Sequence, residues 1–445
     1  MNNLETRQDI KGSDHAPITL TINIDTWRDT SPALLLERAS NLGKTHTHKP
    51  CTTSVSRGPH HENVDLEVFA RRMAQCVPPT LDEVSVESVE TAVKESCDIV
   101  NKIAKACKKT ETNRVISAQP RWKRLMEEND CKTIWKAINW KGEINTNREI
   151  EQPSDNAFKT HFERLLNPSG EDFSELDVEQ SPYIPLLDDP FTPRELDQAI
   201  NSMNKNKSFI GFSPALLVNL PVTWLMFLLT LFNVVFQGFC FPITWCFSKL
   251  IVIFKTGDRM LCDNYRGISI MDTLAKVYDT LIMNRLKIWM AIDKCQAGSM
   301  EGRGCLEQIF ALRMLCDYAI HKKVKLYVLF IDYRKAYDKV PRQKLIQCLK
   351  SLGCGKIMLK AVYMMYKCTN NVLTSATIKS VVGVKQGAPS SCLLFIIYID
   401  QMLRMLKQTI ATDGFLGTLH ALLLMDDTVF VATSQDMCMK NSKLS

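Results

Sequence analysis

The chain has 445 residues, of which 45% are hydrophobic and 23% are charged, and its formal net charge is +7. This composition excludes wholesale disorder and allows two or three domains with ordinary cores. The positive charge is uneven, because residues 101–150 carry 12 Lys and Arg against 6 Asp and Glu. Such a cluster of cations suits a nucleic-acid backbone, although solvated helix surfaces also have it.

The sequence gives several indications of where the protein resides. Its first residues, MNNLETRQDIKG, are polar and do not resemble a signal peptide. The 16 cysteines form no short regular framework, which indicates reduced thiols and an intracellular protein. The apolar run from Leu220 to Phe236 is slightly short for a membrane span, contains Pro221 and Asn233, and has no basic flank. We therefore predict a buried helix there and no membrane partner.

The first 190 residues are predicted to contain three parts. Alternating apolar residues at Ile18–Ile22 indicate a strand within residues 1–25. Residues 26–62 are expected to be a linker, richest in Thr, His, Pro and Ser over residues 40–62. The linker's histidines and Cys51 could bind zinc, but no pair has zinc-finger spacing, so a solvated linker is favoured.

Residues 63–190 are expected to be a mainly helical, basic N-terminal extension. The tryptophans among its cations could stack nucleic-acid bases, although such residues more often belong to a core; they are Trp122, Trp135 and Trp140. After residue 190, Thr192-Pro193-Arg194-Glu195 predicts a helix that begins with a capping box. From Phe241 onward, short apolar runs alternate with helical stretches, which favours an α+β or α/β core.

Two predicted strands end in aspartates that could bind metal ions. The apolar run Leu326–Ile331 ends at Asp332, and a carboxylate there is costly to bury unless it binds something. Two further apolar runs flank Asp426 and Asp427, which predicts a hairpin with both acids at its turn. Either motif alone is more often a solvated turn or an isolated strand end. Together they could hold two Mg²⁺ ions for nucleotide transfer to a primer 3′ hydroxyl.

A glycine-containing loop, Gly383–Ser391, lies between these two strands and precedes an apolar helical stretch from Leu393 to Met405. Glycine allows a backbone to approach a flat ligand closely. The amide of Gln386 could hydrogen-bond to a base or a sugar. Loops of this kind are common, so this motif indicates little by itself.

These segments together resemble the reverse transcriptases of LINE-type (non-LTR) retrotransposons. Phe330–Asp338 is similar to motif A of that family, Gly383–Ser391 to motif B, and Leu424–Asp427 to motif C. Upstream, Trp245–Arg285 and Gln296–Cys305 resemble the motifs of the fingers and the segment that follows them. The similarity begins near residue 190, and its motifs occur in the family order.

The resemblance implies an α+β fold with the fingers and palm of a right-hand polymerase, an antiparallel sheet packed with helices, over residues 191–445. It implies an RNA-directed DNA polymerase with Mg²⁺ as cofactor and an RNA template, a DNA primer and a dNTP as partners. The family's thumb follows motif C, so the chain is expected to be truncated there, with the thumb missing, and to be a poor polymerase or none. The expected compartments are the cytoplasm and the nucleus, and the oligomeric state is left open.

The resemblance also implies roles for individual residues. Asp332 and Asp426 would be the principal Mg²⁺ ligands, with Asp427 supporting them. Tyr337 would be the steric gate against a ribose 2′ hydroxyl. The other substrate-binding residues would be Lys255 and Arg266, which reach the triphosphate, and Gln386 and Gly387.

Three positions depart from the family's pattern. Leu424–Met425 stands where an aromatic residue and alanine usually precede the aspartate pair. Ser391–Cys392 replaces the Ser-Pro of motif B, and residues 208–211 lack the usual Pro-Gly loop. Methionine is tolerated at this point in related polymerases, so the catalytic assignment stands.

The N-terminus carries a second resemblance. Ser13–Pro17 is similar to the last motif of the apurinic-type endonuclease that precedes the polymerase in many LINE elements. In that motif the histidine is a general base that the aspartate orients. Residues 1–25 are therefore expected to be a remnant of such a domain, in which Asp14 and His15 are not catalytic.

Two alternatives stay open at this point. A truncated, non-catalytic nucleic-acid-binding relic would keep the palm without synthesising DNA. A reverse transcriptase of the group II intron or retron type shares the palm, but the endonuclease-like start and the fingers motifs disfavour it.

Overall fold

The computed structural model describes residues 63–81, 84–108, 152–171, 180–205, 209–374, 376–409 and 421–436, three isolated residues, and the backbone of two short strands. Those strands, β1 (Leu4–Thr6) and β2 (Ile18–Leu20), pair antiparallel, and β2 lies where a strand was expected. The predictions for other features lie outside the described residues: Asp14, His15, the linker's histidines and Cys51, Trp122, Trp135 and Trp140.

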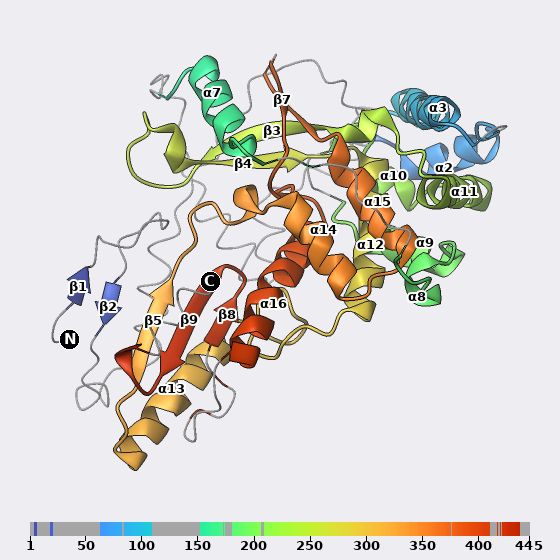
Figure 1. Ribbon diagram of the computed structural model, residues 1–445. Coiled ribbons are helices and arrows are strands. Elements are labelled where there is room, and N and C mark those ends of the chain that lie inside the picture. Colours follow the sequence, from blue (N-terminus) through green and yellow to red (C-terminus); the bar gives the residue numbers. More distant parts are fainter. Residues whose placement is uncertain are drawn as a thin grey trace, which may run out of the picture.

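A three-stranded antiparallel sheet carries the aspartates. Its order is β5 (Tyr327–Ile331), β9 (Asp427–Ala432) and β8 (Ala421–Leu424). Two long helices, α13 (Cys305–Lys322) and α16 (Ser391–Thr409), lie beside this sheet (Figure 1). The hairpin expected around Asp426 and Asp427 and the helix expected after the glycine-containing loop are both confirmed.

A four-stranded sheet lies above the first in the view of Figure 1. Its order is β4 (Tyr265–Ile270), β3 (Phe247–Phe254), β6 (Asn370–Leu373) and β7 (Ala376–Lys379). The β3–β6 pair is parallel, and the other two pairs are antiparallel. The two sheets and their helices confirm the predicted α+β class.

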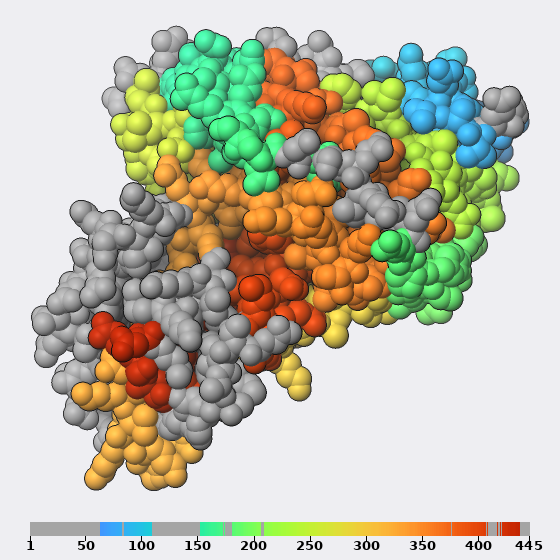
Figure 2. Space-filling view, viewed as in Figure 1, coloured from blue at the N-terminus to red at the C-terminus, as the bar shows by residue number. Residues whose placement is uncertain are grey.

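Helix α7 (Asp155–Leu166) packs on the four-stranded sheet (Figure 1). In the space-filling view its atoms form part of the surface, beside yellow-green and orange segments (Figure 2). Its three buried side chains lie on one face at helical spacing and form an apolar stripe. Together with four residues of the sheet they form a small core: Phe158, Phe162, Leu166, Leu250, Tyr265, Leu373 and Ile378. Helix α7, which belongs to the expected N-terminal extension, thus packs on this sheet. The domain boundaries at residues 25, 62 and 190 stay predictions.

A larger apolar core joins the remaining helices. Helix α9 (Pro193–Ser202) begins with the expected capping box, in which the side chains of Thr192 and Glu195 each accept a hydrogen bond from the other residue's backbone N–H. Within the described part of the chain, no helix has both the length and the apolar character needed to cross a membrane. The remaining elements are α2 (Leu66–Ala74), α3 (Val86–Ala106), α8 (Pro185–Asp188), α9 (Pro193–Ser202), α10 (Pro214–Leu217), α11 (Val222–Gly238), α12 (Thr273–Trp289), α14 (Arg342–Ser351), α15 (Lys356–Lys367), and the 3₁₀ helices η3 (Ile243–Cys246), η4 (Cys262–Asn264) and η5 (Tyr337–Lys339).

Candidate active site

The strand register brings the three aspartates together. Ile331, the last residue of β5, pairs with Thr428 of β9, so Asp332 follows directly beside the start of β9. Leu424 pairs with Asp427 across the β8–β9 hairpin, which leaves Met425 and Asp426 as a two-residue loop. The carboxylates of Asp332, Asp426 and Asp427 therefore lie at one end of the three-stranded sheet.

The electrostatics of Asp426 report which groups surround it. Burial raises the pKa of the Asp426 carboxyl, the nearby Asp332 carboxylate raises it further, and Arg266 and Lys255 oppose both effects. Burial, Asp426 and Asp332 likewise raise the pKa of Asp427, while Lys255 lowers it. Carboxylates that disfavour one another's ionisation form a site that a cation would stabilise.

The two cations belong to the β3–β4 hairpin. Lys255 follows β3, and its backbone N–H donates to the Asn264 carbonyl oxygen at 2.8 Å. Arg266 lies on β4, where it pairs with Ile253 of β3. The hairpin thus places Lys255 and Arg266 near the aspartates. Both cations could pair there with phosphate oxygens.

The turn that carries Asp426 is held by Gln296, for which the sequence predicts no role. Met425 has a φ of +62°, a conformation that costs energy for a residue other than glycine. The buried Gln296 side chain pairs with the Met425 backbone, because its Oε1 accepts from the N–H at 2.9 Å and its Nε2 donates to the carbonyl at 3.2 Å. The same Oε1 accepts from the N–H of Gly298 at 2.7 Å. The only signal in the sequence was that Gln296 opens one of the segments similar to the family.

Tyr337 lies between the aspartates and α16. Its ring stacks on Phe395, with 4.5 Å between the ring centroids. Its hydroxyl donates to the Cys392 Sγ at 3.9 Å. Burial, Cys392 and the charge of Asp426 all raise the pKa of this phenol, so the hydroxyl lies within electrostatic reach of Asp426.

Gln386 and Gly387 are fixed to β4. The Ser269 N–H donates to the Gln386 carbonyl oxygen at 2.7 Å. Gly387 has a φ of +110°, and a Cβ there would lie 2.7 Å from the Ser269 carbonyl oxygen. A close approach that requires glycine is therefore made to the protein's own strand β4.

The donor set of the site fits Mg²⁺. Mg²⁺ prefers hard oxygen ligands and is usually held by one or two carboxylates, with substrate phosphates and water completing its coordination. In the residues that the structure describes, no three His, Cys, Asp or Glu side chains are close enough to form a complete metal site by themselves. This is expected for a Mg²⁺ site in which the phosphates of a bound nucleotide provide the remaining ligands.

A second feature near the site is a basic pocket of about 650 Å³ between α7 and the loop after β5. Its lining contains one histidine and five charged residues: His161, Arg164, Asp263, Arg334, Lys335 and Lys339. Asp263 pairs with Arg334 at 2.8 Å and with Lys335 at 3.2 Å. Burial and the nearby Lys335 lower the pKa of His161, as expected where cations are crowded.

Comparison with known proteins agrees with this geometry. Residues 253–443 match the family described as reverse transcriptase (RNA-dependent DNA polymerase). The chain is 28% identical over 274 residues to a probable RNA-directed DNA polymerase from transposon BS of Drosophila melanogaster, covering 58% of this chain and 30% of that protein. It is 29% identical over 180 residues to the RNA-directed DNA polymerase from mobile element jockey of Drosophila melanogaster, covering 39% of this chain and 20% of that protein.

A structural comparison finds a truncated apo telomerase from Candida tropicalis, with a TM-score of 0.32 and 15% identity over 45% of this chain and 46% of that one. The chain spans about 30% of the length of the transposon BS polymerase. The endonuclease remnant stays a prediction. Residues 253–443 therefore match the reverse transcriptase family, and the chain is similar to RNA-directed DNA polymerases of transposable elements.

Proposed function

We propose that the protein is an RNA-directed DNA polymerase that transfers a nucleotide from a dNTP to the 3′ hydroxyl of a DNA primer paired with an RNA template. The observation that carries the proposal is the approach of Asp332 to Asp426 and Asp427, with Lys255 and Arg266 beside them. The polymerase activity named for the relatives supports the same conclusion.

In this proposal, Asp332 and Asp426 hold Mg²⁺, and Asp427 supports them. Two bound Mg²⁺ ions would supply activation of the primer hydroxyl and neutralisation of the leaving pyrophosphate. Lys255 and Arg266 bind the triphosphate oxygens through charge-assisted hydrogen bonds. The ring of Tyr337, held by Phe395, limits the space beside the sugar of the nucleotide.

The direct test is addition of a single nucleotide to a DNA primer annealed to RNA, with the 445-residue protein in excess over the primer. Excess protein makes the assay insensitive to weak duplex binding. We expect the complementary dNTP to be added in the presence of Mg²⁺ and not in EDTA. A protein that adds no nucleotide at any Mg²⁺ concentration would contradict the proposal.

The gate assignment predicts a change in sugar selectivity. Replacing Tyr337 with valine removes the ring that fills the space of a 2′ hydroxyl, so incorporation of ribonucleotides relative to dNTPs is expected to rise by roughly ten- to a hundredfold. The ratio of kcat/KM for the two nucleotides measures this effect. Tyr318→Val, at an exposed position of α13, is the control. Equal selectivity in Tyr337→Val and the parent would refute the assignment.

We also propose that the basic pocket binds a backbone phosphate of the nucleic acid. The double variant Arg164→Ala, Lys339→Ala is then expected to weaken RNA binding about tenfold and to lower the slope of log affinity against log salt by roughly one. Titrations of labelled RNA at several salt concentrations measure both quantities.

The matched control for this prediction removes two cations from α13, as Arg313→Ala with Lys322→Ala. Helix α13 lies at the opposite end of the molecule from α7 in Figure 1. An unchanged salt slope in the pocket variant, or the same loss in both double variants, would show that the pocket is not a specific contact.

A further inference from the structure

The loop that follows β5 is bonded to the glycine-containing loop. The N–H of Gly383 donates to the Val340 carbonyl oxygen at 2.8 Å, and the N–H of Val384 donates to the Tyr337 carbonyl oxygen at 2.9 Å. Gly383 has a φ of +80°, and a Cβ there would lie 2.7 Å from the Asp338 carbonyl oxygen. The backbones of the two loops are therefore in direct contact, and a side chain at Gly383 would separate them.

Arg342 fixes this junction from inside the protein. Its guanidinium is buried and donates to the carbonyl oxygens of Gly383 at 2.9 Å and Tyr366 at 3.0 Å, and to the Ser380 Oγ at 2.8 Å. A cavity of only about 20 Å³ lies among these residues, enough for about one water molecule. Arg342 and the residues around it are thus closely packed beneath the two loops. The side chains that line this cavity have little room to change position.

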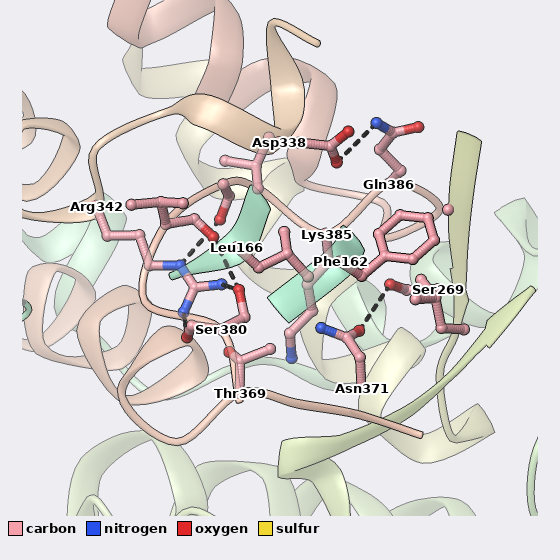
Figure 3. Close-up of a pocket in the computed structure, with 15 residues that line it drawn as sticks. Phe162, Leu166, Ser269, Asp338, Arg342, Thr369, Asn371, Ser380, Lys385 and Gln386 are labelled. Carbon is pink, nitrogen blue, oxygen red and sulfur yellow. Dashed lines mark hydrogen bonds between the residues drawn. The ribbon is translucent and has the colours of Figure 1, made fainter. Parts of the chain in front are cut away.

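Asp338 and Gln386 project from this frame toward one another (Figure 3). The Gln386 Nε2 donates to the Asp338 Oδ1 at 2.9 Å. A glutamine amide can occupy two orientations that exchange its oxygen and its nitrogen, but an ionised carboxylate can only accept hydrogen bonds. Asp338 therefore selects the orientation in which the nitrogen faces it, and Figure 3 shows the Gln386 oxygen pointing away.

Asp338 also lies near the catalytic groups. Burial raises the pKa of its carboxyl to about 6, and Lys335, the hydrogen bond from Gln386, and Arg266 oppose that rise. The carboxyl is therefore mainly ionised between pH 7 and pH 8, as the orienting role requires. Arg266 lowers the pKa of Asp426 as well as that of Asp338, so both carboxyls lie within electrostatic reach of the same guanidinium.

We propose that Asp338 is a positioning residue of the nucleotide site, whose carboxylate orients the Gln386 amide so that its carbonyl oxygen faces the incoming nucleotide. The nucleotide group recognised there is then a hydrogen-bond donor, either a hydroxyl or an amino group. This inference rests on the proposed function and assigns one element of its substrate recognition.

Exchanging the donor and the acceptor of the Gln386–Asp338 hydrogen bond tests the inference. Gln386→Glu places two carboxylates against one another, and it is expected to raise KM for the complementary dNTP about tenfold while kcat changes less than about threefold. Adding Asp338→Asn restores a donor opposite the new carboxylate. The double variant is therefore expected to return to within about threefold of the parent KM. A double variant no better than Gln386→Glu would overturn the inference.

Removal of both side chains gives a second, independent result. Asp338→Ala and Gln386→Ala are each expected to raise KM, and the double alanine variant should be no worse than Gln386→Ala alone, because Asp338 acts through Gln386. If the double variant raised KM by the product of the two single effects, Asp338 would act independently of Gln386. Asp317→Ala, a carboxylate on the surface of α13, is the control and should leave KM unchanged.

Thermal unfolding separates a failure of this inference from a failure of the proposed function. If the parent adds no nucleotide, the proposed function fails, but the hydrogen bond can still be measured. Gln386→Glu should then lower Tm, and the added Asp338→Asn should recover it. No recovery of Tm would show that the two side chains do not interact, which also overturns the inference.

Discussion

Replacing Asp426 with alanine is expected to lower the rate of nucleotide addition by at least about a thousandfold, since it removes an oxygen ligand from a site whose chemistry depends on bound cations. The loss should appear in kcat, because the metal stabilises charge that develops during transfer. Single-turnover addition of one dNTP measures the rate.

The same substitution should leave the fold intact. Burial and Asp332 raise the pKa of the Asp426 carboxyl, so its charged form is less stable in the folded protein than in the unfolded chain. Removing that charge is therefore expected to leave Tm unchanged or to raise it, as substitutions in functional sites often do. Asp317→Ala is the matched control, and a variant at Asp426 that keeps more than about a hundredth of the parent rate would contradict the assignment.

Replacing Gly298 with alanine is expected to have the second-largest effect, although this residue makes no contact with substrate in our account. A Cβ at Gly298 would overlap the backbone N of Met425 and would lie 2.5 Å from its Sδ and 2.6 Å from its Cγ. The Met425 side chain can move away, but its backbone cannot move without displacing the Asp426 loop. A displacement of about 1 Å in a catalytic group can cost on the order of a hundredfold in rate, and we expect a loss of that size.

The chain contains a matched control for this prediction. Gly304 lies six positions after Gly298, has extended backbone, and has no atom within 4 Å of the position of an added Cβ. Gly304→Ala should therefore keep the parent rate. Equal rates for Gly298→Ala and Gly304→Ala would show that the packing of Gly298 on the turn does not position Asp426.

The aspartates could be found from the sequence because their signal is local. An apolar run that ends in an acid indicates a strand end, and two such runs around an Asp pair indicate a hairpin turn. The capping box of Thr192 and Glu195 was likewise contained within four consecutive residues. In each case a short pattern determined the structure, and the pairing of β5 with β9 then brought the acids together.

The residues that hold the site could not be found in this way. Gln296 bonds to a residue 129 positions away in the sequence, and Asp338 bonds to one 48 positions away. Polar side chains give no local sign of so distant a partner, and both would otherwise be assigned to the surface. The packing of α7 on the sheet is similar, because Asn167 bonds to the Lys379 carbonyl oxygen 212 positions away.

Binding of Mn²⁺ in the presence of a dNTP would show whether Asp332 and Asp426 share one metal site, because Mn²⁺ is a paramagnetic probe for a Mg²⁺ site. Electron paramagnetic resonance of free Mn²⁺ would be followed in the parent, Asp332→Ala, Asp426→Ala and Asp317→Ala. If Asp332 and Asp426 hold one metal site together with the nucleotide phosphates, the parent and Asp317→Ala bind Mn²⁺ equally, and both other variants lose that binding together. Equal Mn²⁺ binding by all four proteins would show that Asp332 and Asp426 do not bind the metal.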